Sequence, residues 1–243
     1  MNHRENRAAE KPVQIPIHGR ILQGDLTIPD SARGIILFAH GSGSSRLSPR
    51  NRYVARQLEN AGLGTLLMDL LTREEEKIDA ESGALRFDIE LLAHRLMEST
   101  RWLADRQNTK SLRVGYFGAS TGAAAALVAA ATIPDLVAAV VSRGGRPDLA
   151  GRWLSKVLAP TLLIVGGEDW TVLELNRTAL AELRGEKRLE IVPGASHLFE
   201  EPGALEAVAQ LATTWFTRHI AANGPAPRPM AGIGTKTQDV NRK

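Results

Sequence analysis

The chain has 243 residues, of which 43% are hydrophobic and 23% charged, enough apolar sequence for one globular domain with a sizeable core. Cysteine is absent, which excludes a disulfide scaffold, a cysteine nucleophile and thiolate metal sites. No apolar run approaches the ~20 residues of a membrane span, and the first residues lack the apolar segment of a secretory signal. We therefore expect a cytoplasmic protein without a membrane partner.

The formal net charge is +3, and its position along the chain argues against nucleic-acid binding. Residues 222–243 contain four cations and one anion and carry the whole excess, so that residues 1–221 sum to zero. This tail is rich in proline and glycine, and we expect it, like residues 1–11, to be disordered. We place the folded domain at residues 12–221. A surface that binds nucleic acid would need cations clustered on this domain.

Between these ends, short apolar runs alternate with longer amphipathic ones. Segments 13–18 and 21–28 predict an opening antiparallel hairpin. Further strands are expected at 34–40, 64–69, 112–117, 137–141, 161–165 and 188–192. Helices are expected at 49–61, 85–106, 121–131, 172–183 and 204–219. Within the polar, acidic segment 72–82, the run 74–77 is expected to be a solvated loop, and the segment is in a position that would suit a lid. Strands that alternate with helical crossovers predict a doubly wound α/β domain with a mostly parallel sheet.

Ligands of such a sheet bind beyond the carboxyl ends of its strands, so the residues that follow each strand carry the chemistry. Strand 112–117 is followed by Gly118-Ala-Ser-Thr-Gly122, a G-x-S-x-G sequence, and then by a helix of small residues. A serine on a sharp strand-to-helix turn needs small neighbours, exposes its hydroxyl and lies at a helix N-terminus that favours negative charge. The pattern predicts that Ser120 is a nucleophile. The alternative is a glycine-rich packing turn in which the serine only caps the helix.

A serine nucleophile needs a base, and the base needs an orienting carboxylate. His197 lies in the loop between the last strand and the last helix, at the edge of the sheet where Ser120 is expected. Asp169 follows strand 161–165 and two glycines, and Asp148 is the competing acid. The chain order Ser120, Asp169, His197 is the order that this sheet topology requires.

The sequence His40-Gly-Ser-Gly-Ser-Ser45 follows the first buried strand and can bring a backbone N–H next to the nucleophile. We expect the amides of Ser42 and Thr121 to form an oxyanion hole, and His40 to fix the loop rather than to take part in the chemistry. As a dinucleotide fingerprint the segment lacks its third glycine, and no G-x-x-x-x-G-K-[ST] occurs. No cofactor is therefore predicted.

Taken in order, HGSGSS, GASTG, VGGED and GASHLF resemble the α/β-hydrolase superfamily, and within it the dienelactone-hydrolase-like branch. SRGGRPDLAG and LRFDI are similar to members that occur fused to a phosphoribosyltransferase domain, of which this sequence has no signature. The resemblance covers residues 12–221 and implies the α/β-hydrolase fold, with Ser120, Asp169 and His197 as the triad of an ester or lactone hydrolase. The namesake enzymes use a cysteine nucleophile where this chain has Ser120, which argues against dienelactone itself as the substrate.

These features predict a serine hydrolase, free of metals and cofactors, that cleaves small carboxylic esters or lactones through an acyl-enzyme. Arg86 and Arg143 are candidates for binding a substrate carboxylate, because the guanidinium fork matches it bidentately. Salt bridges to Asp88, Glu81 or Asp148 are the alternative for these arginines. An acyltransferase would use the same triad, and a non-catalytic scaffold of the same fold is the third possibility.

Overall fold

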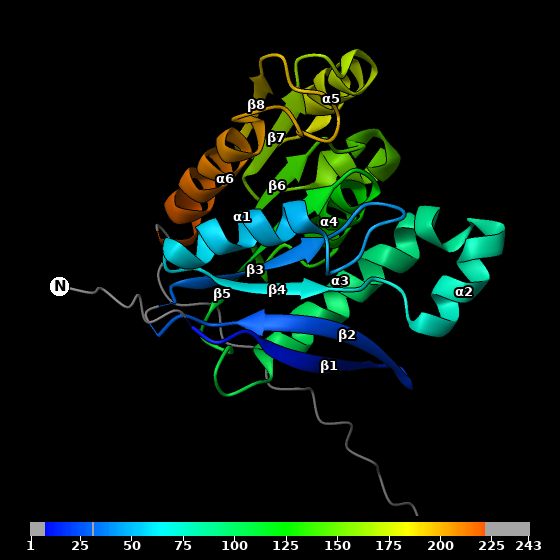
Figure 1. Cartoon of the computed structure of the whole chain (residues 1–243), viewed down its shortest axis with the longest axis vertical. Coiled ribbons are helices and arrows are strands. Elements are labelled where there is room, and N and C mark those ends of the chain that lie inside the picture. Colours follow the sequence, from blue (N-terminus) through cyan, green and yellow to red (C-terminus); the bar gives the residue numbers. More distant parts are fainter. Residues whose placement is uncertain (1–7, 31, 222–243) are drawn as a thin grey trace, which may run out of the picture.

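The computed structural model describes residues 8–30 and 32–221, and within them eight strands form one sheet (Figure 1). The strand order is β1-β2-β4-β3-β5-β6-β7-β8. β2 pairs antiparallel with β1 and β4, and all other neighbours are parallel. The strands are β1 (Lys11–Ile17), β2 (Arg20–Thr27), β3 (Gly34–Ala39), β4 (Gly64–Met68), β5 (Arg113–Ala119), β6 (Val137–Arg143), β7 (Thr161–Gly166) and β8 (Lys187–Val192). The predicted α/β fold with its opening hairpin is confirmed.

Helices cover both faces of the sheet, and the core lies between them and the strands (Figure 1). The helices are α1 (Pro49–Asn60), α2 (Arg73–Ser82), α3 (Ile89–Ala104), α4 (Thr121–Thr132), α5 (Trp170–Glu182) and α6 (Ala204–Ala221), with 3-10 segments η1 (Leu85–Phe87) and η2 (Pro147–Lys156). α1 and α6 pack on one face, and α3 and α4 on the other. Every residue of β3, β4 and β7 is buried, as the continuous apolar runs of these strands require. No described helix is long and apolar enough to cross a membrane.

Residues 73–82 are helical, so the solvated loop expected at 74–77 is wrong. Thr72 and Glu75 form a capping box, in which the Thr72 hydroxyl accepts the Glu75 N–H at 3.2 Å and the Glu75 carboxylate accepts the Thr72 N–H at 2.8 Å. The helix ends at Gly83, whose φ of 66° places it in the left-handed region that favours glycine. α2 lies beyond the carboxyl end of β4 (Figure 1).

Smaller differences concern the ends of elements. The expected helix 85–106 is divided at Asp88, whose carboxylate accepts the Leu91 N–H at 2.9 Å and so begins α3. Lys11, expected in the disordered N-terminal segment, is the first residue of β1. The predicted disorder of the tail 222–243 and of residues 1–7 lies outside the described residues.

Candidate active site

Ser120 lies on a strained turn between β5 and α4. Its backbone has φ 50° and ψ −122°, a conformation that costs a non-glycine residue free energy. A Cβ at Gly118 would lie 2.4 Å from the Ala123 Cα, and one at Gly122 would lie 2.2 Å from the Ala39 carbonyl oxygen. Both outer residues of the G-x-S-x-G sequence must therefore be glycine for the turn to close. The Ser120 side chain makes no capping hydrogen bond to α4, so the interpretation of a capping serine is wrong.

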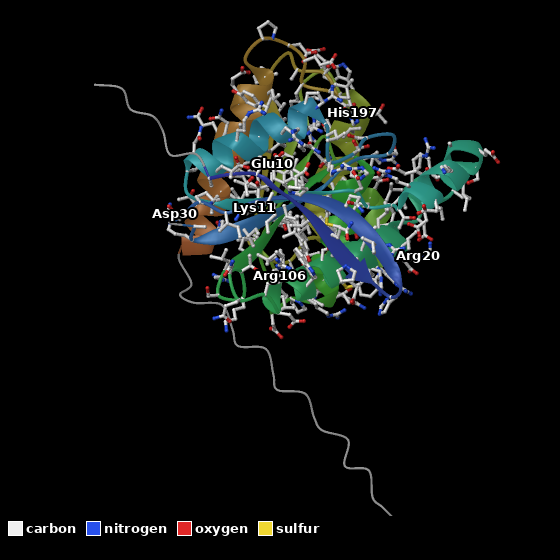
Figure 2. The ribbon with its side chains drawn as sticks, turned by 60° about the horizontal axis from the view of Figure 1, so that its bottom comes forward. Glu10, Lys11, Arg20, Asp30, Arg106 and His197 are labelled. Atoms are coloured by element: carbon white, nitrogen blue, oxygen red, sulfur yellow. The ribbon has the colours of Figure 1, made fainter. Side chains whose placement is uncertain are left out.

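His197 and Asp169 form a hydrogen-bonded pair at the same edge of the sheet. His197 lies on the loop between β8 and α6 (Figure 2), and its Nδ1 donates to Asp169 Oδ2 at 2.6 Å. The loops that carry the two residues are in close contact, since a Cβ at Gly166 would lie 2.3 Å from the Ala195 carbonyl oxygen. With its proton on Nδ1, the imidazole presents the lone pair of Nε2 as a proton acceptor.

The segment between β6 and η2 contacts both Ser120 and His197. The Ser120 N–H donates to the Arg143 carbonyl at 3.4 Å, and the Arg146 N–H donates to the Ser120 carbonyl at 3.1 Å. A Cβ at Gly144 would lie 3.5 Å from His197 Nδ1, so the imidazole packs against this glycine. Among the described residues, no hydrogen bond joins the Ser120 hydroxyl to His197. Such bonds are often long in an enzyme without substrate and tighten when it binds.

The loop after β3 closes over the nucleophile from the other side. A Cβ at Gly41 would lie 2.9 Å from the Ser120 Cβ, so only glycine allows this approach. The Ser42 N–H, expected to be a free oxyanion donor, donates to the Thr121 hydroxyl at 3.0 Å. His40 is buried and binds backbone at both ring nitrogens: Nε2 accepts the Leu70 N–H at 3.1 Å, and Nδ1 donates to the Gly41 carbonyl at 3.0 Å. Burial lowers the pKa of His40, which keeps this histidine neutral and structural.

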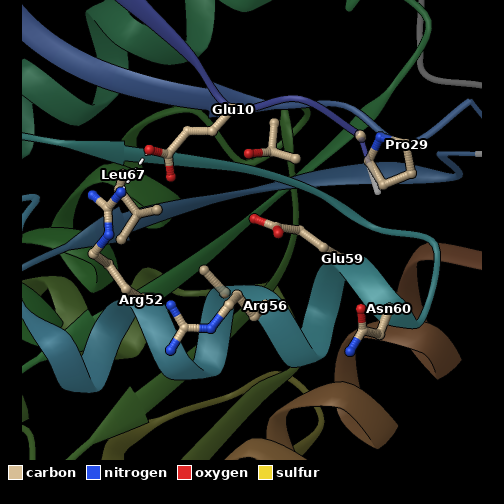
Figure 3. A pocket seen from close by; sticks show the side chains of 10 residues that line it. Glu10, Pro29, Arg52, Arg56, Glu59, Asn60 and Leu67 are labelled. Atoms are coloured by element: carbon tan, nitrogen blue, oxygen red, sulfur yellow. Dashed lines mark hydrogen bonds and ion pairs between the residues drawn. The ribbon is translucent and has the colours of Figure 1, made fainter. Parts of the chain in front are cut away.

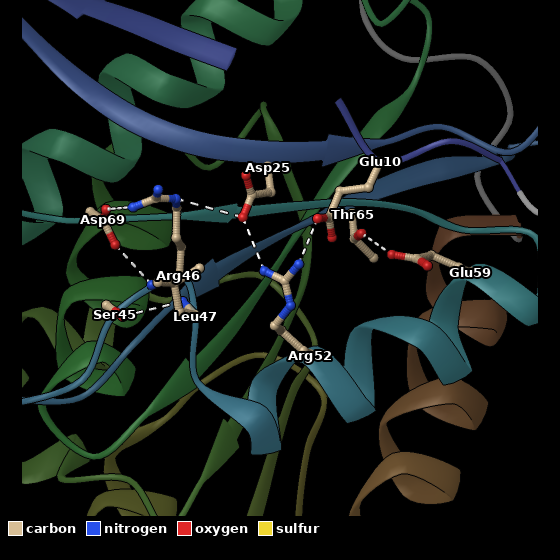
Figure 4. Close-up of polar contacts among 9 residues, drawn as sticks. All are labelled: Glu10, Asp25, Ser45, Arg46, Leu47, Arg52, Glu59, Thr65 and Asp69. Atoms are coloured by element: carbon tan, nitrogen blue, oxygen red, sulfur yellow. Dashed lines mark hydrogen bonds and ion pairs between the residues drawn. The ribbon is translucent and has the colours of Figure 1, made fainter. Parts of the chain in front are cut away.

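A network of charged side chains anchors the same loop to β2 and β4 (Figure 4). Asp69, directly after β4, accepts the backbone N–H of Arg46 at 2.8 Å and also pairs with the Arg46 guanidinium. Asp25 on β2 lies 3.6 Å from the same guanidinium and 3.1 Å from that of Arg52, which in turn pairs with Glu10 at 2.5 Å. Burial, and then the nearby Glu10 carboxylate, raise the pKa of Asp25. Sequence reasoning missed this network, because its members come from four separate segments.

A cavity of about 220 Å³ opens beside the nucleophile turn. One wall is the loop after β3 together with Thr121, and the other comprises Leu70, Leu71, Leu92, Glu76, Asp79 and Arg86. A larger cavity, of about 510 Å³, lies between β2, β4 and α1 (Figure 3). Its wall holds Glu10, Arg52, Arg56 and Glu59, and neither of the predicted oxyanion residues, whereas Ser42 and Thr121 both line the smaller cavity. The smaller cavity is therefore the candidate substrate pocket.

The two candidate substrate arginines have different surroundings. Arg86 lines the smaller cavity and donates through Nε to Asp79 Oδ2 at 2.5 Å, so its partner is none of the three acids considered from the sequence. Arg143 is only 8% exposed, and its guanidinium lies 5.8 Å from the Phe199 ring centre. Its Nε and Nη1 have no hydrogen-bond acceptor in the described structure. Burial, and then the positive charge of Arg50, lower the pKa of Arg143 to about 10.

The competing acid Asp148 is engaged elsewhere. Its carboxylate accepts two hydrogen bonds from the Arg146 guanidinium, at 2.9 and 2.8 Å. It makes no contact of this kind with His197, whereas Asp169 does. In the part of the chain that the structure describes, no group of three or more histidine, aspartate or glutamate side chains could hold a metal ion.

The model of the dienelactone hydrolase family matches residues 22–220 of this chain. Two Mycobacterium tuberculosis proteins, both named as phosphoribosyl transferases, are 59% identical over 217 residues, which is 89% of this chain and 48% of each relative. The chain thus spans about half the length of the curated relatives it matches.

Solved structures also match. A dienelactone hydrolase from Anabaena variabilis is 61% identical with a TM-score of 0.87, over 88% of this chain and 99% of that one. Est1E from Butyrivibrio proteoclasticus is 16% identical with a TM-score of 0.72, over 86% and 99% of the two chains, and shares the fold.

Proposed function

The chain belongs to the dienelactone hydrolase family, and we propose that it is a serine hydrolase that cleaves small carboxylic esters or lactones. The observation that carries the proposal is the strained turn at Ser120, whose hydroxyl caps nothing, at the sheet edge that also holds the His197–Asp169 pair. Backbone strain of this kind persists where the surrounding structure enforces it, and it clusters at active sites. Asp148, bound to Arg146, is not part of the proposed triad.

In the proposed route, the Ser120 oxygen attacks the substrate carbonyl carbon while its proton passes to His197 Nε2. The tetrahedral intermediate collapses when the bond to the leaving oxygen breaks, and that oxygen takes the proton from Nε2. Water then attacks the acyl-enzyme in the same way, which releases the acid and restores the serine hydroxyl. Asp169 holds the imidazole by its Nδ1 proton and stabilises the imidazolium formed in each half-reaction. No step of this route needs a metal or a cofactor.

The oxyanion formed in each half-reaction needs donors, and the backbone of the turn supplies one. Thr121 is the first residue of α4, so its N–H has no acceptor within the helix. The N-terminus of α4 adds the positive end of the helix dipole at the same point. The loop after β3 lies against the same point, because the close approach of Gly41 brings its neighbour Ser42 next to Ser120. Each such donor contributes about 3 kcal/mol to stabilising the transition state.

The dimensions and the leucines of the pocket favour a small substrate with an apolar part. Leu70, Leu71 and Leu92 provide apolar contacts in a cavity of about 220 Å³. Arg86 reaches the same cavity, and we propose that it binds a substrate carboxylate. Arg143 stays a second candidate for this role: it is a buried cation without an acceptor, but it does not line the cavity.

The two Mycobacterium relatives that are named as phosphoribosyl transferases are about twice as long as the region that this chain matches. The match to those relatives extends over 217 residues, and the hydrolase family model covers 22–220. We therefore assign the hydrolase chemistry to this segment.

A fluorophosphonate probe tests the proposal directly. We expect one probe molecule per chain, attached to Ser120, as measured by intact mass and peptide mapping. Ser120→Ala should abolish both the labelling and the hydrolysis of p-nitrophenyl esters and of lactones, with the thermal unfolding midpoint unchanged. A variant that keeps more than a few per cent of wild-type turnover would refute the nucleophile. Product analysis with an added alcohol separates hydrolysis from acyl transfer, and an unlabelled wild-type protein would indicate a scaffold.

A further inference from the structure

The contact between Ser42 and Thr121 changes the expected composition of the oxyanion hole. An amide that stabilises an oxyanion points its N–H at the oxygen from about 3 Å. The Ser42 N–H already has an oxygen at 3.0 Å, the hydroxyl of Thr121. As long as this bond lasts, the Ser42 amide is occupied and a substrate oxygen must find another donor.

The Thr121 hydroxyl is free to be that donor. A hydroxyl carries one proton and two lone pairs, and the bond from Ser42 uses a lone pair. Threonines within helices commonly donate their proton to the carbonyl four residues before them. Four do so in this structure, with oxygen–oxygen distances of 2.8 to 3.1 Å: Thr100, Thr132, Thr178 and Thr214.

Thr121 cannot follow that pattern, because it is the first residue of α4 and the residue four positions earlier, Phe117, lies in the sheet. Within the described residues its hydroxyl donates to no carbonyl. The side chain is nevertheless almost fully buried, 3% exposed, and it lines the cavity next to the nucleophile turn. Within the described residues the hydroxyl proton thus has no carbonyl acceptor, and its residue lies in the wall of the candidate pocket, directly after Ser120.

We infer that the Thr121 side-chain hydroxyl is itself an oxyanion donor, with the Ser42 amide acting through it. This inference rests on the proposed function. The amide nitrogen and the hydroxyl oxygen of one threonine are three bonds apart, which is close enough for both to bind one acceptor. Because the hydroxyl accepts the Ser42 N–H, it is fixed in orientation and its own proton becomes a stronger donor. Thr121 then supplies two hydrogen bonds to the oxyanion, and Ser42 is a positioning residue.

Three threonine substitutions test the inference. Thr121→Val keeps the shape of the side chain and removes the hydroxyl, and we expect kcat to fall about 100-fold while KM changes little. Thr121→Ser should recover most of the loss, because it restores the hydroxyl. Thr132→Val makes the same change at the other end of α4, where the hydroxyl binds the Val128 carbonyl, and should leave turnover unchanged. If Thr121→Val does not fold, Thr121→Ala replaces it with the same expectation.

A thionoester substrate distinguishes a donor from a residue that merely shapes the loop. Sulfur is a weak hydrogen-bond acceptor, so a thionoester gains little from the hole. In Thr121→Val the rate for the oxoester should fall, whereas the rate for the thionoester should change little. The ratio of the oxoester rate to the thionoester rate should therefore fall by about the same factor as the oxoester rate. Equal losses for both substrates would overturn the inference and leave a structural role. A Thr121→Val enzyme as fast as the wild type, or faster, would also overturn the inference. The hydroxyl would then not donate to the oxyanion but only fill the space in which the oxyanion binds.

The outcome of this test is separable from that of the proposed function. If a fluorophosphonate fails to label the wild type at Ser120, the proposed function is refuted and the inference with it. If the wild type and Thr121→Val are both labelled but turn over equally, only the inference is refuted. Labelling of both enzymes with the expected loss of kcat supports it.

Discussion

Replacement of Asp169 by asparagine isolates the contribution of its charge and of its role as an acceptor. The carboxylate accepts the proton of His197 Nδ1 at 2.6 Å, and its side chain is 14% exposed, so water replaces it poorly. An amide NH₂ in that place would donate to Nδ1 and move the imidazole proton to Nε2, where it blocks proton transfer from Ser120. By analogy with the serine-protease triad, kcat should fall about 10⁴-fold, which corresponds to about 5 kcal/mol.

The assay is steady-state hydrolysis of a p-nitrophenyl ester, with Asp148→Asn as the matched control. That substitution removes a carboxylate from the pair with Arg146, in which the two side chains are 25% and 39% exposed. A pair this accessible contributes at most about 1 kcal/mol, and it does not touch His197. We expect kcat of the control to stay within about threefold of the wild type. If Asp148→Asn were the more damaging change, or if Asp169→Asn kept a hundredth of the activity, the assignment of the acid would be wrong.

Two further predictions concern stability. Burial lowers the pKa of His40 below 6.5, so the unfolded state binds more protons than the folded state near and below this pH. The free energy of unfolding should therefore fall as the pH drops below about 6.5, by up to about 1.4 kcal/mol per pH unit. Denaturant titrations at several pH values measure this slope, and His40→Gln should flatten it; an unchanged slope would assign it to other groups. Glu75→Gln should lower the free energy of unfolding by about 3 kcal/mol, because Arg95 loses a buried charged partner. The control is Glu174→Gln, because Glu174 forms an exposed pair with Arg177. This substitution should change the free energy of unfolding by less than about 1 kcal/mol.

The sheet and the positions of the proposed triad were predictable because both follow from local patterns. Apolar runs identify strands, and the parallel topology brings the residue after each strand to one edge. Asp169 and His197 are 28 residues apart, yet their pairing needed only the knowledge that each follows a strand. The turn at Ser120 was predictable for a similar reason, since Gly118 and Gly122 mark its close approaches in the sequence itself.

Two kinds of feature were not predicted. Some depend on side-chain contacts between segments far apart in the sequence, and one, helix α2, had a sequence signal that was outweighed by its acidic composition. Ser42 and Thr121 are 79 residues apart, and nothing in either segment indicates that the hydroxyl of one meets the amide of the other. Phe199, whose ring lies near the buried Arg143 guanidinium, comes from another loop. Helix α2 is different, because its capping box, Thr72-x-x-Glu75, was present in the sequence. Its three consecutive glutamates favoured an expectation of a solvated loop, although acidic residues in a first turn stabilise a helix.

The contacts of Glu75 also decide what α2 can do over the site. Its carboxylate pairs at 2.8 Å with Arg95 of α3 and at 2.8 Å with Arg20 at the tip of the β1–β2 hairpin. The Glu75 and Arg95 side chains are only 8% and 5% exposed, so swinging α2 away would leave a buried charge without its partner. That costs about 3 to 5 kcal/mol, which keeps the open form at a fraction on the order of 10⁻³. α2 is therefore a fixed wall of the pocket, carrying Glu76 and Asp79 into its lining, and the exposed residues Ser42 and Gly43 belong to the opposite wall.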